Sequence, residues 1–133
     1  MAANTNPIFI KSGGIAHVKM TAANTSRDGS GSNVYTLVAG STEGRRINKI
    51  VIKAVVTTAA IGMVRFFLDD GTTVMAWREE QIAAATVSAS VKGATVEILL
   101  QGENALILPT GWTLKCTTHT ANETHVTAHY GDY

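Results

Sequence analysis

Residues 46–58 constrain the fold more than any other part of the chain. Apolar side chains recur at every second position through this segment, and most of them are β-branched. A period of two places successive side chains on opposite faces of a strand, whereas a helix shows a period of 3.6 residues. β-branched residues also favour strands over helices. Both faces of this predicted strand are largely apolar, which indicates a central strand that is buried on two sides or covered by a neighbour.

Similar short alternating runs follow one another along most of the chain, separated by turn residues. The segment 69–72 contains the Asp-Gly pair of a tight hairpin, and the segment 109–111 contains a Pro-x-Gly turn. No interval carries a convincing amphipathic helical pattern, which disfavours a parallel βαβ architecture. The predicted strands are 15–21, 33–39, 46–58, 62–69, 74–82, 95–100, 105–108, 112–118 and 124–130.

This pattern predicts an all-β fold, a jelly-roll-like antiparallel β-sandwich of about eight strands. The strands recur at the spacing of roughly 8–12 residues that is typical of sandwiches and barrels. We expect an extended N-terminal arm over residues 1–14 and a single sandwich domain over residues 15–133. Residues 24–33 are predicted to form a flexible loop, and residues 81–91 fit either a strand or a loop.

The charge content points away from nucleic acid and toward protein partners. Charged residues make up 16% of the chain, and its formal net charge is +1. Nucleic-acid binding depends on many Lys and Arg residues, whereas the cores of protein interfaces are depleted of charge. The one basic cluster, Arg45 and Arg46 with Lys49 and Lys53 nearby, is interpreted as a solvated face. No signal peptide and no membrane-spanning apolar run is predicted, so we expect no membrane partner.

The histidines are the first candidates for a metal site. His125 and His129 share one face of a predicted strand, but four strand residues separate them by roughly 13 Å. One zinc ion, with Zn–N bonds of about 2.0 Å, does not span that distance. His17 and His119 lie elsewhere in the sequence, so a site within one chain would need the fold to gather them. We therefore predict no metal site, and interpret the histidines as surface or interface residues, with a metal or pH-sensitive cluster on an oligomer axis as the alternative.

The residues of enzymatic sites are also missing from the sequence pattern. No nucleophile elbow and no phosphate-binding loop is present. Asp69 and Asp70 are explained by the hairpin turn, and Cys116 is predicted to be a small buried side chain on an alternating strand. We therefore expect no catalytic residue, no cofactor and no enzymatic activity.

Three stretches of the sequence resemble a family of small virion structural proteins of tailed bacteriophages, which includes capsid decoration (cement) proteins. The stretches are MTAANTSRDGSG (20–31), VYTLVAGSTEGRRINKIVIKAVVTTAAIGMVRFFLDDGT (34–72) and LPTGWTLKCTTHTANETHVTAHYGDY (108–133). The similarity departs from the family pattern over residues 81–96, which are rich in Ala and Ser. The resemblance implies a β-sandwich that sits on a capsid or tail, often as a homotrimer, and it carries no catalytic residues.

From the resemblance we expect a decoration protein that binds the major capsid protein lattice as a homotrimer and stabilises the shell. It would be made in the host cytoplasm and reside on the capsid surface of the virion. The expected contact residues are Ile8, Phe9 and Ile10 in the arm, with Arg45 and Arg46. The arm, residues 1–11, is interpreted either as a segment that orders on the capsid or as a frayed terminus. Alternatively, the chain is a tail, baseplate or fibre-associated module that contacts host glycans.

Overall fold

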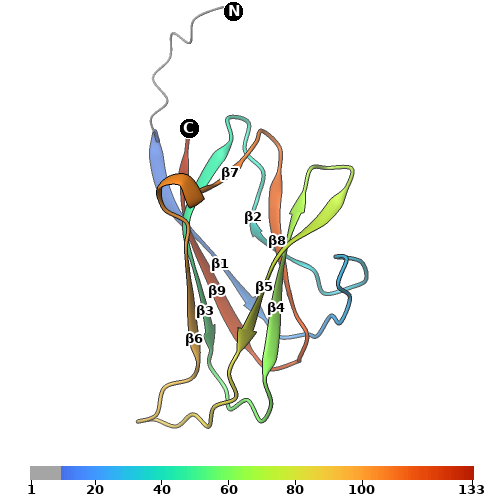
Figure 1. Ribbon diagram of the computed structural model, residues 1–133, viewed down its shortest axis with the longest axis vertical. Coiled ribbons are helices and arrows are strands. Elements are labelled where there is room, and N and C mark those ends of the chain that lie inside the picture. The colour runs from blue at the N-terminus through green and yellow to red at the C-terminus, as the bar shows by residue number, and fades with distance from the viewer. Residues whose placement is uncertain (1–9) are drawn as a thin grey trace, which may run out of the picture.

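The chain folds into two antiparallel β-sheets that pack face to face (Figure 1). The computed structural model describes residues 10–133. Sheet A has the strand order β1-β9-β3-β6, with β7 also paired to β3, and sheet B has the order β2-β8-β4-β5. The elements are β1 (Ser12–Met20), β2 (Tyr35–Val38), β3 (Arg45–Ala54), β4 (Gly62–Asp69), β5 (Val74–Ile82), β6 (Thr95–Leu99), the 3-10 helix η1 (Gly102–Asn104), β7 (Leu106–Leu108), β8 (Thr113–Thr118) and β9 (Thr124–Asp132).

The strand pairing is that of a jelly roll. The chain behaves as one long hairpin folded over on itself, in which β1 pairs with β9, β2 with β8, β3 with β6 and β7, and β4 with β5. Two further pairings, β3 with β9 and β4 with β8, complete the sheets. The predicted jelly-roll-like sandwich is therefore confirmed. The first strand begins at Ser12, within the range that the sequence assigned to the arm.

The core lies between the sheets and is built from the side chains that point inward at every second position of each strand. Phe66 is fully buried, and Trp77 packs against it edge-on with the ring centroids 6.3 Å apart. The register between β4 and β5 shifts next to Phe66, which leaves Trp77 without a strand partner. Val64, Phe66 and Leu114 are buried at inward positions of β4 and β8. Trp77 and Trp112 are half-buried against the same core.

The segment between β1 and β2 is folded against the outer face of sheet B. The Asn24 side chain is buried and donates to the carbonyl oxygens of Ser30 and Ser32, at 2.9 and 2.6 Å. Its own Oδ1 accepts the N–H of Ser26 at 2.8 Å. The prediction of a loop is correct, and these hydrogen bonds from one side chain hold it in a defined shape.

The structure decides two stretches that the sequence left wrong or open, residues 55–58 and residues 81–91. β3 ends at Ala54, four residues before the predicted end, and Thr58 instead forms an isolated bridge to Ala85. The ambiguous residues 81–91 finish β5 at Ile82 and then form a loop. Between residues 10 and 133, no helix combines the length and the apolar character that crossing a bilayer requires.

Candidate interaction surface

The outer face of sheet A is the candidate functional surface, because it gathers the unusual exposed side chains of the chain. Opposite residues in neighbouring strands project on the same side of a sheet, so the register fixes which side chains are neighbours. Read across β1, β9, β3 and then β6 or β7, this face carries four rows: Gly13, Gly131, Arg46 and Ile107; Ile15, His129, Lys49 and Leu99; His17, Thr127, Val51 and Glu97; Lys19, His125, Lys53 and Thr95.

Aliphatic side chains stand at the margins of the first two rows. Ile15 is 61% exposed on β1, Leu99 is 57% exposed on β6, and Ile107 is 56% exposed on β7. Ile10, 39% exposed, covers Gly131, since a Cβ atom built there would lie within 3.1 Å of three Ile10 side-chain carbons. These four are half of the eight large apolar side chains that are exposed between residues 10 and 133. Grouped exposure of this kind is typical of surfaces that bind a partner.

Cations occupy the centre of the same face. Lys49 lies 3.6 Å from Glu97, and Lys19 lies 3.6 Å from Glu123. Arg46 and Lys53 form no ion pair with the residues that the structure describes, and the buried Nε of Arg46 has no hydrogen-bond partner among them. Lys53 Nζ donates to the Thr95 hydroxyl at 3.3 Å, so neither cation is neutralised by a carboxylate of the described residues.

Three of the four histidines also lie on this face. His129 is opposite Ile15, His125 is opposite Lys19, and His17 is diagonal to both across β1 and β9. The sequence placed His125 and His129 on one face but gave no register that would add His17. The Cα atoms of diagonal neighbours on two paired strands are roughly 7–8 Å apart, so their side chains share one charge environment. No group of three or more metal-ligating side chains that could hold an ion occurs within residues 10–133.

His119, the fourth histidine, has a structural role instead. Its Nδ1 accepts the N–H of Met63 at 2.9 Å, and its own N–H donates to the Met63 carbonyl at 3.0 Å. These two hydrogen bonds join the end of β8 to the start of β4. His119 is therefore separate from the histidines of sheet A.

The predicted contact residues fall into three situations. Ile8 and Phe9 lie outside the described residues. Ile10 and Arg46 come together on the outer face of sheet A, because Ile10 covers Gly131 and Gly131 pairs with Arg46. Arg45 points to the other side of β3, where its Nε donates to Asp132 at 2.6 Å, its Nη1 donates to the Ala39 carbonyl at 2.8 Å, and its guanidinium lies 4.6 Å from the Tyr130 ring centre. The charge of Arg45 is thus engaged within the fold.

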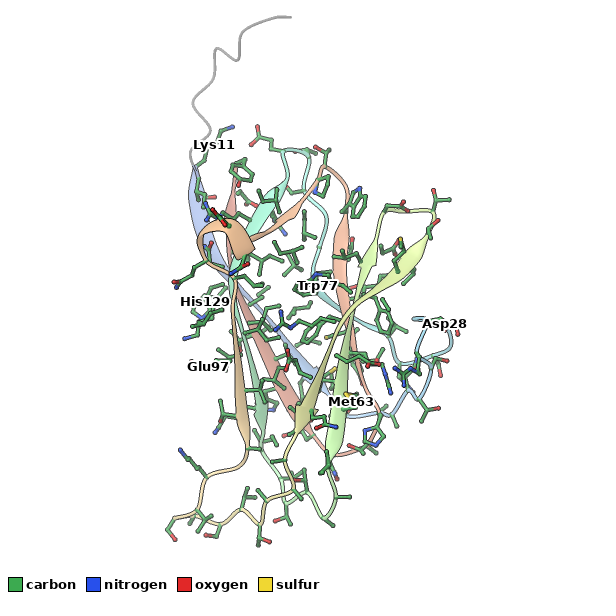
Figure 2. The ribbon with its side chains drawn as sticks, in the orientation of Figure 1. Lys11, Asp28, Met63, Trp77, Glu97 and His129 are labelled. Atoms are coloured by element: carbon green, nitrogen blue, oxygen red, sulfur yellow. The ribbon has the colours of Figure 1, made fainter. Side chains whose placement is uncertain are left out.

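The opposite side of the molecule has a different character. Glu79 accepts from both Arg65, at 2.9 Å, and Arg27, at 3.2 Å, and Lys115 pairs with Asp69 at 2.7 Å. Glu79 thus joins two arginines, one from β4 and one from the loop between β1 and β2. In Figure 2, Glu97 and His129 project away from the sandwich on the side of sheet A, whereas Asp28 lies on the side of sheet B.

The carboxylates on the sheet B side are held in their charged form. Hydrogen bonds from the hydroxyl and N–H of Ser30 lower the pKa of Asp28. The Lys115 ammonium and the Gly71 N–H lower the pKa of Asp69, and the N–H groups of Thr73 and Thr72 lower that of Asp70. A carboxylate that accepts such bonds stays ionised at lower pH than a free one. This side of the molecule therefore keeps its negative charges under mildly acidic conditions.

Comparison with known proteins adds only weak likenesses. No protein-family model matches the sequence, and no curated protein matches it. The chain is similar to a pentameric capsid protein isolated from metagenomic phage sequences, with 15% identity over 89% of this chain and a TM-score of 0.44. It spans 60% of the length of that protein. It is also similar to chitosan-binding module 1 of a chitosanase/glucanase from Paenibacillus sp. IK-5, with 14% identity over 89% of this chain and 94% of that one, and a TM-score of 0.32. Both likenesses are too distant to assign a function.

Proposed function

We propose that this chain is a virion structural protein of a tailed phage, a capsid decoration protein that binds the major capsid lattice as a homotrimer and reinforces the shell. The observation that carries the proposal is the outer face of sheet A. It combines the exposed Ile10, Ile15, Leu99 and Ile107 with Arg46 and Lys53, two cations that form no ion pair within residues 10–133. Surfaces that bind proteins show this mixture of apolar anchors and polar groups.

The size of this face favours attachment by several copies. Four strands about 4.8 Å apart and nine residues at about 3.3 Å each give a face of roughly 600 Å². Each partner of a stable interface contributes about 800 Å². One copy would therefore attach weakly through this face alone, whereas a trimer that engages the lattice at three points gains affinity through effective concentration.

The sequence supplies the second line of support. The stretches 20–31, 34–72 and 108–133 resemble small virion structural proteins of tailed phages. The same segments form the β1–β2 loop, the strands β2 to β4, and the strands β8 and β9, so they include much of both sheets. Jelly rolls are one of the architectures used by viral capsid domains, although they also occur in lectins and cupins.

The test is to mix the purified protein with capsids from which it has been removed and to determine the particle structure by cryo-EM. We expect added density at regular lattice positions, three copies per position, with sheet A turned toward the shell. A bare lattice together with protein bound at the tail would overturn the decoration role and favour a tail or fibre module. Native mass spectrometry of the free protein tests the trimer independently.

A variant of the arm tests its contribution separately. Replacing Ile8 and Phe9 with serine leaves residues 10–133 unchanged, so the sandwich is expected to fold as before. If the arm orders on the capsid, this variant binds the lattice more weakly than the parent chain. Unchanged affinity would leave attachment to the outer face of sheet A and identify the arm as a frayed terminus.

A further inference from the structure

The charges of the sandwich are divided unequally between its two sides. The outer face of sheet A and the adjoining Glu123 hold four cations and two carboxylates, a net charge of +2: Lys19, Arg46, Lys49, Lys53, Glu97 and Glu123. Sheet B and its covering loop hold four cations and five carboxylates, a net charge of −1: Arg27, Arg65, Arg78, Lys115, Asp28, Asp69, Asp70, Glu79 and Glu80. The formal net charge of +1 for the whole chain conceals this difference.

The groups around each histidine are known from the register. His129 lies between Ile15 of β1 and Lys49 of β3. His125 lies between Lys19 of β1 and Lys53 of β3, and its Nε2 is 3.2 Å from Glu123.

His17 is on the free edge of the sheet, opposite Thr127 and on the strand of Lys19. Two strands, β9 and β3, lie between it and Glu97 of β6, and β7 adds no charged group to this face. Cations therefore outnumber carboxylates around the three histidines.

This environment decides between the possible occupants. A second copy that used the same face would bring its net charge of +2 against the same charge on the first copy, and like charges across an interface are unfavourable. A nucleic acid would match the cations but would leave the exposed Ile15, Leu99 and Ile107 against phosphates. An acidic protein surface with apolar side chains among its carboxylates matches both the cations and the aliphatic margin.

We propose that the outer face of sheet A binds an acidic, partly apolar protein surface through its cations and its aliphatic margin. The proposal rests on the proposed function in one respect: the partner is the exposed face of the capsid lattice.

The first experiment uses immobilised poly-L-glutamate as the probe and compares two charge-matched double variants. Arg46→Gln with Lys53→Gln removes the two cations of sheet A that lack an ion pair. Arg78→Gln with Lys92→Gln removes two cations elsewhere. Two exposed charge contacts correspond to about a tenfold loss of affinity. We expect that loss in the first variant only. Equal losses in both variants would overturn the proposal.

The second experiment locates the bound probe by NMR. Histidine NMR signals of the unaltered chain give a readout that needs no variant. Adding poly-L-glutamate should shift three imidazole signals and leave that of His119 in place, and a shift confined to His119 would contradict the assignment.

Two further arms separate this inference from the decoration role. If duplex DNA binds the face more tightly than poly-L-glutamate, and Arg46→Gln with Lys53→Gln abolishes that binding, the occupant is nucleic acid and the inference is wrong. If the parent chain binds capsids and the two double variants bind capsids equally well, the decoration role is supported but the outer face of sheet A is not the contact surface. If poly-L-glutamate binding behaves as expected and capsids are not bound, the outer face of sheet A is an acidic-partner surface but the decoration role is wrong.

Discussion

Gly29 and Phe67 lie in direct contact, although one belongs to the loop between β1 and β2 and the other to β4. A Cβ atom at residue 29 would lie 3.1 Å from Cδ1 of Phe67 and 2.7 Å from Cγ1 of Val74. Phe67 is fully buried, yet it is separate from the core between the sheets, because it faces outward beside Lys115. The loop therefore covers an aromatic ring that sheet B would otherwise expose to water.

The first prediction concerns Gly29→Ala. Residue 29 has a φ of +82°, which is unfavourable for a residue with a side chain, and the added methyl group would collide with Val74 and Phe67. The two effects together should lower the free energy of unfolding by about 2–4 kcal/mol. Urea denaturation followed by circular dichroism measures this loss.

Gly71→Ala is the matched control for this prediction. Residue 71 has a φ of +96°, but no atom lies within 4 Å of the position that a Cβ would take. The control therefore carries the backbone penalty without the collision, and should cost about 1 kcal/mol. A loss for Gly29→Ala no greater than for Gly71→Ala would show that the loop does not pack on Phe67 as described.

The second prediction concerns the pH dependence contributed by Asp69. Lys115, 2.7 Å away, and the Gly71 N–H lower the pKa of this carboxyl in the folded chain. The stabilisation is therefore complete above the pKa of an unfolded aspartate, about 4. It is lost as the pH falls through the lower pKa of the folded state.

We accordingly expect Asp69→Asn to destabilise the fold by about 1 kcal/mol at pH 7. Thermal melting at a series of pH values should show the two melting temperatures converging below about pH 4, where the parent carboxyl becomes protonated. Lys115→Gln provides the control, since the double variant should lose less than the sum of the two single losses. A difference that stays constant down to pH 2 would contradict the ion pair.

Strand positions could be predicted from sequence because alternation is a local property. Gly62–Asp69 is predicted to the residue, since its alternating run stops at the Asp-Gly turn, and the start of β5 at Val74 is predicted as well. The end of β5 at Ile82 falls in residues 81–91, which fit either a strand or a loop by sequence. The end of β3 could not be predicted: residues 55–58 continue the β-branched pattern, but the chain there leaves sheet A and Thr58 bridges to Ala85. The alternation of side chains within one strand does not indicate where its partner strand ends.

The candidate surface depends on register, which no local pattern contains. His17 and His129 are more than a hundred residues apart in the sequence and become neighbours only because β1 pairs with β9. Arg45 and Arg46 looked equivalent as an adjacent basic pair, but alternation sends them to opposite sides of β3. Within residues 10–133, Arg45 pairs with a carboxylate, Asp132, and Arg46 does not. The distinction between a structural arginine and an available one therefore requires the fold.

The third prediction concerns the single cysteine. Cys116 is fully buried on the inner side of β8, and burial raises the pKa of its thiol to about 12. The thiolate is the reactive form, so the folded chain should react negligibly with Ellman's reagent at pH 8. Reaction should follow the unfolding transition when urea is added, with the fully denatured chain as the control. Rapid labelling in the absence of denaturant would show that β8 is open to solvent.

The fourth prediction compares the same truncation on the two faces of sheet A. Ile50 is fully buried between the sheets and Ile15 is 61% exposed on the outer face. Ile50→Ala removes buried methyl and methylene groups and leaves a cavity, so it should lower the free energy of unfolding by about 2–5 kcal/mol. Ile15→Ala removes groups that are already in water, and should change it by less than about 0.5 kcal/mol.

Capsid binding should respond to these two variants in the opposite order. If the outer face of sheet A is the contact surface, Ile15→Ala weakens binding at unchanged stability, because its side chain would be buried only in the complex. Ile50→Ala, tested at a temperature where it remains folded, should bind as the parent does, since its side chain is covered in both states. Affinity on stripped capsids, measured together with the unfolding curve of each variant, separates these effects. Leu99→Ala and Ile107→Ala test the other margin of the face in the same way. If all three outer-face variants bind capsids as the parent chain does, the contact surface is not the outer face of sheet A.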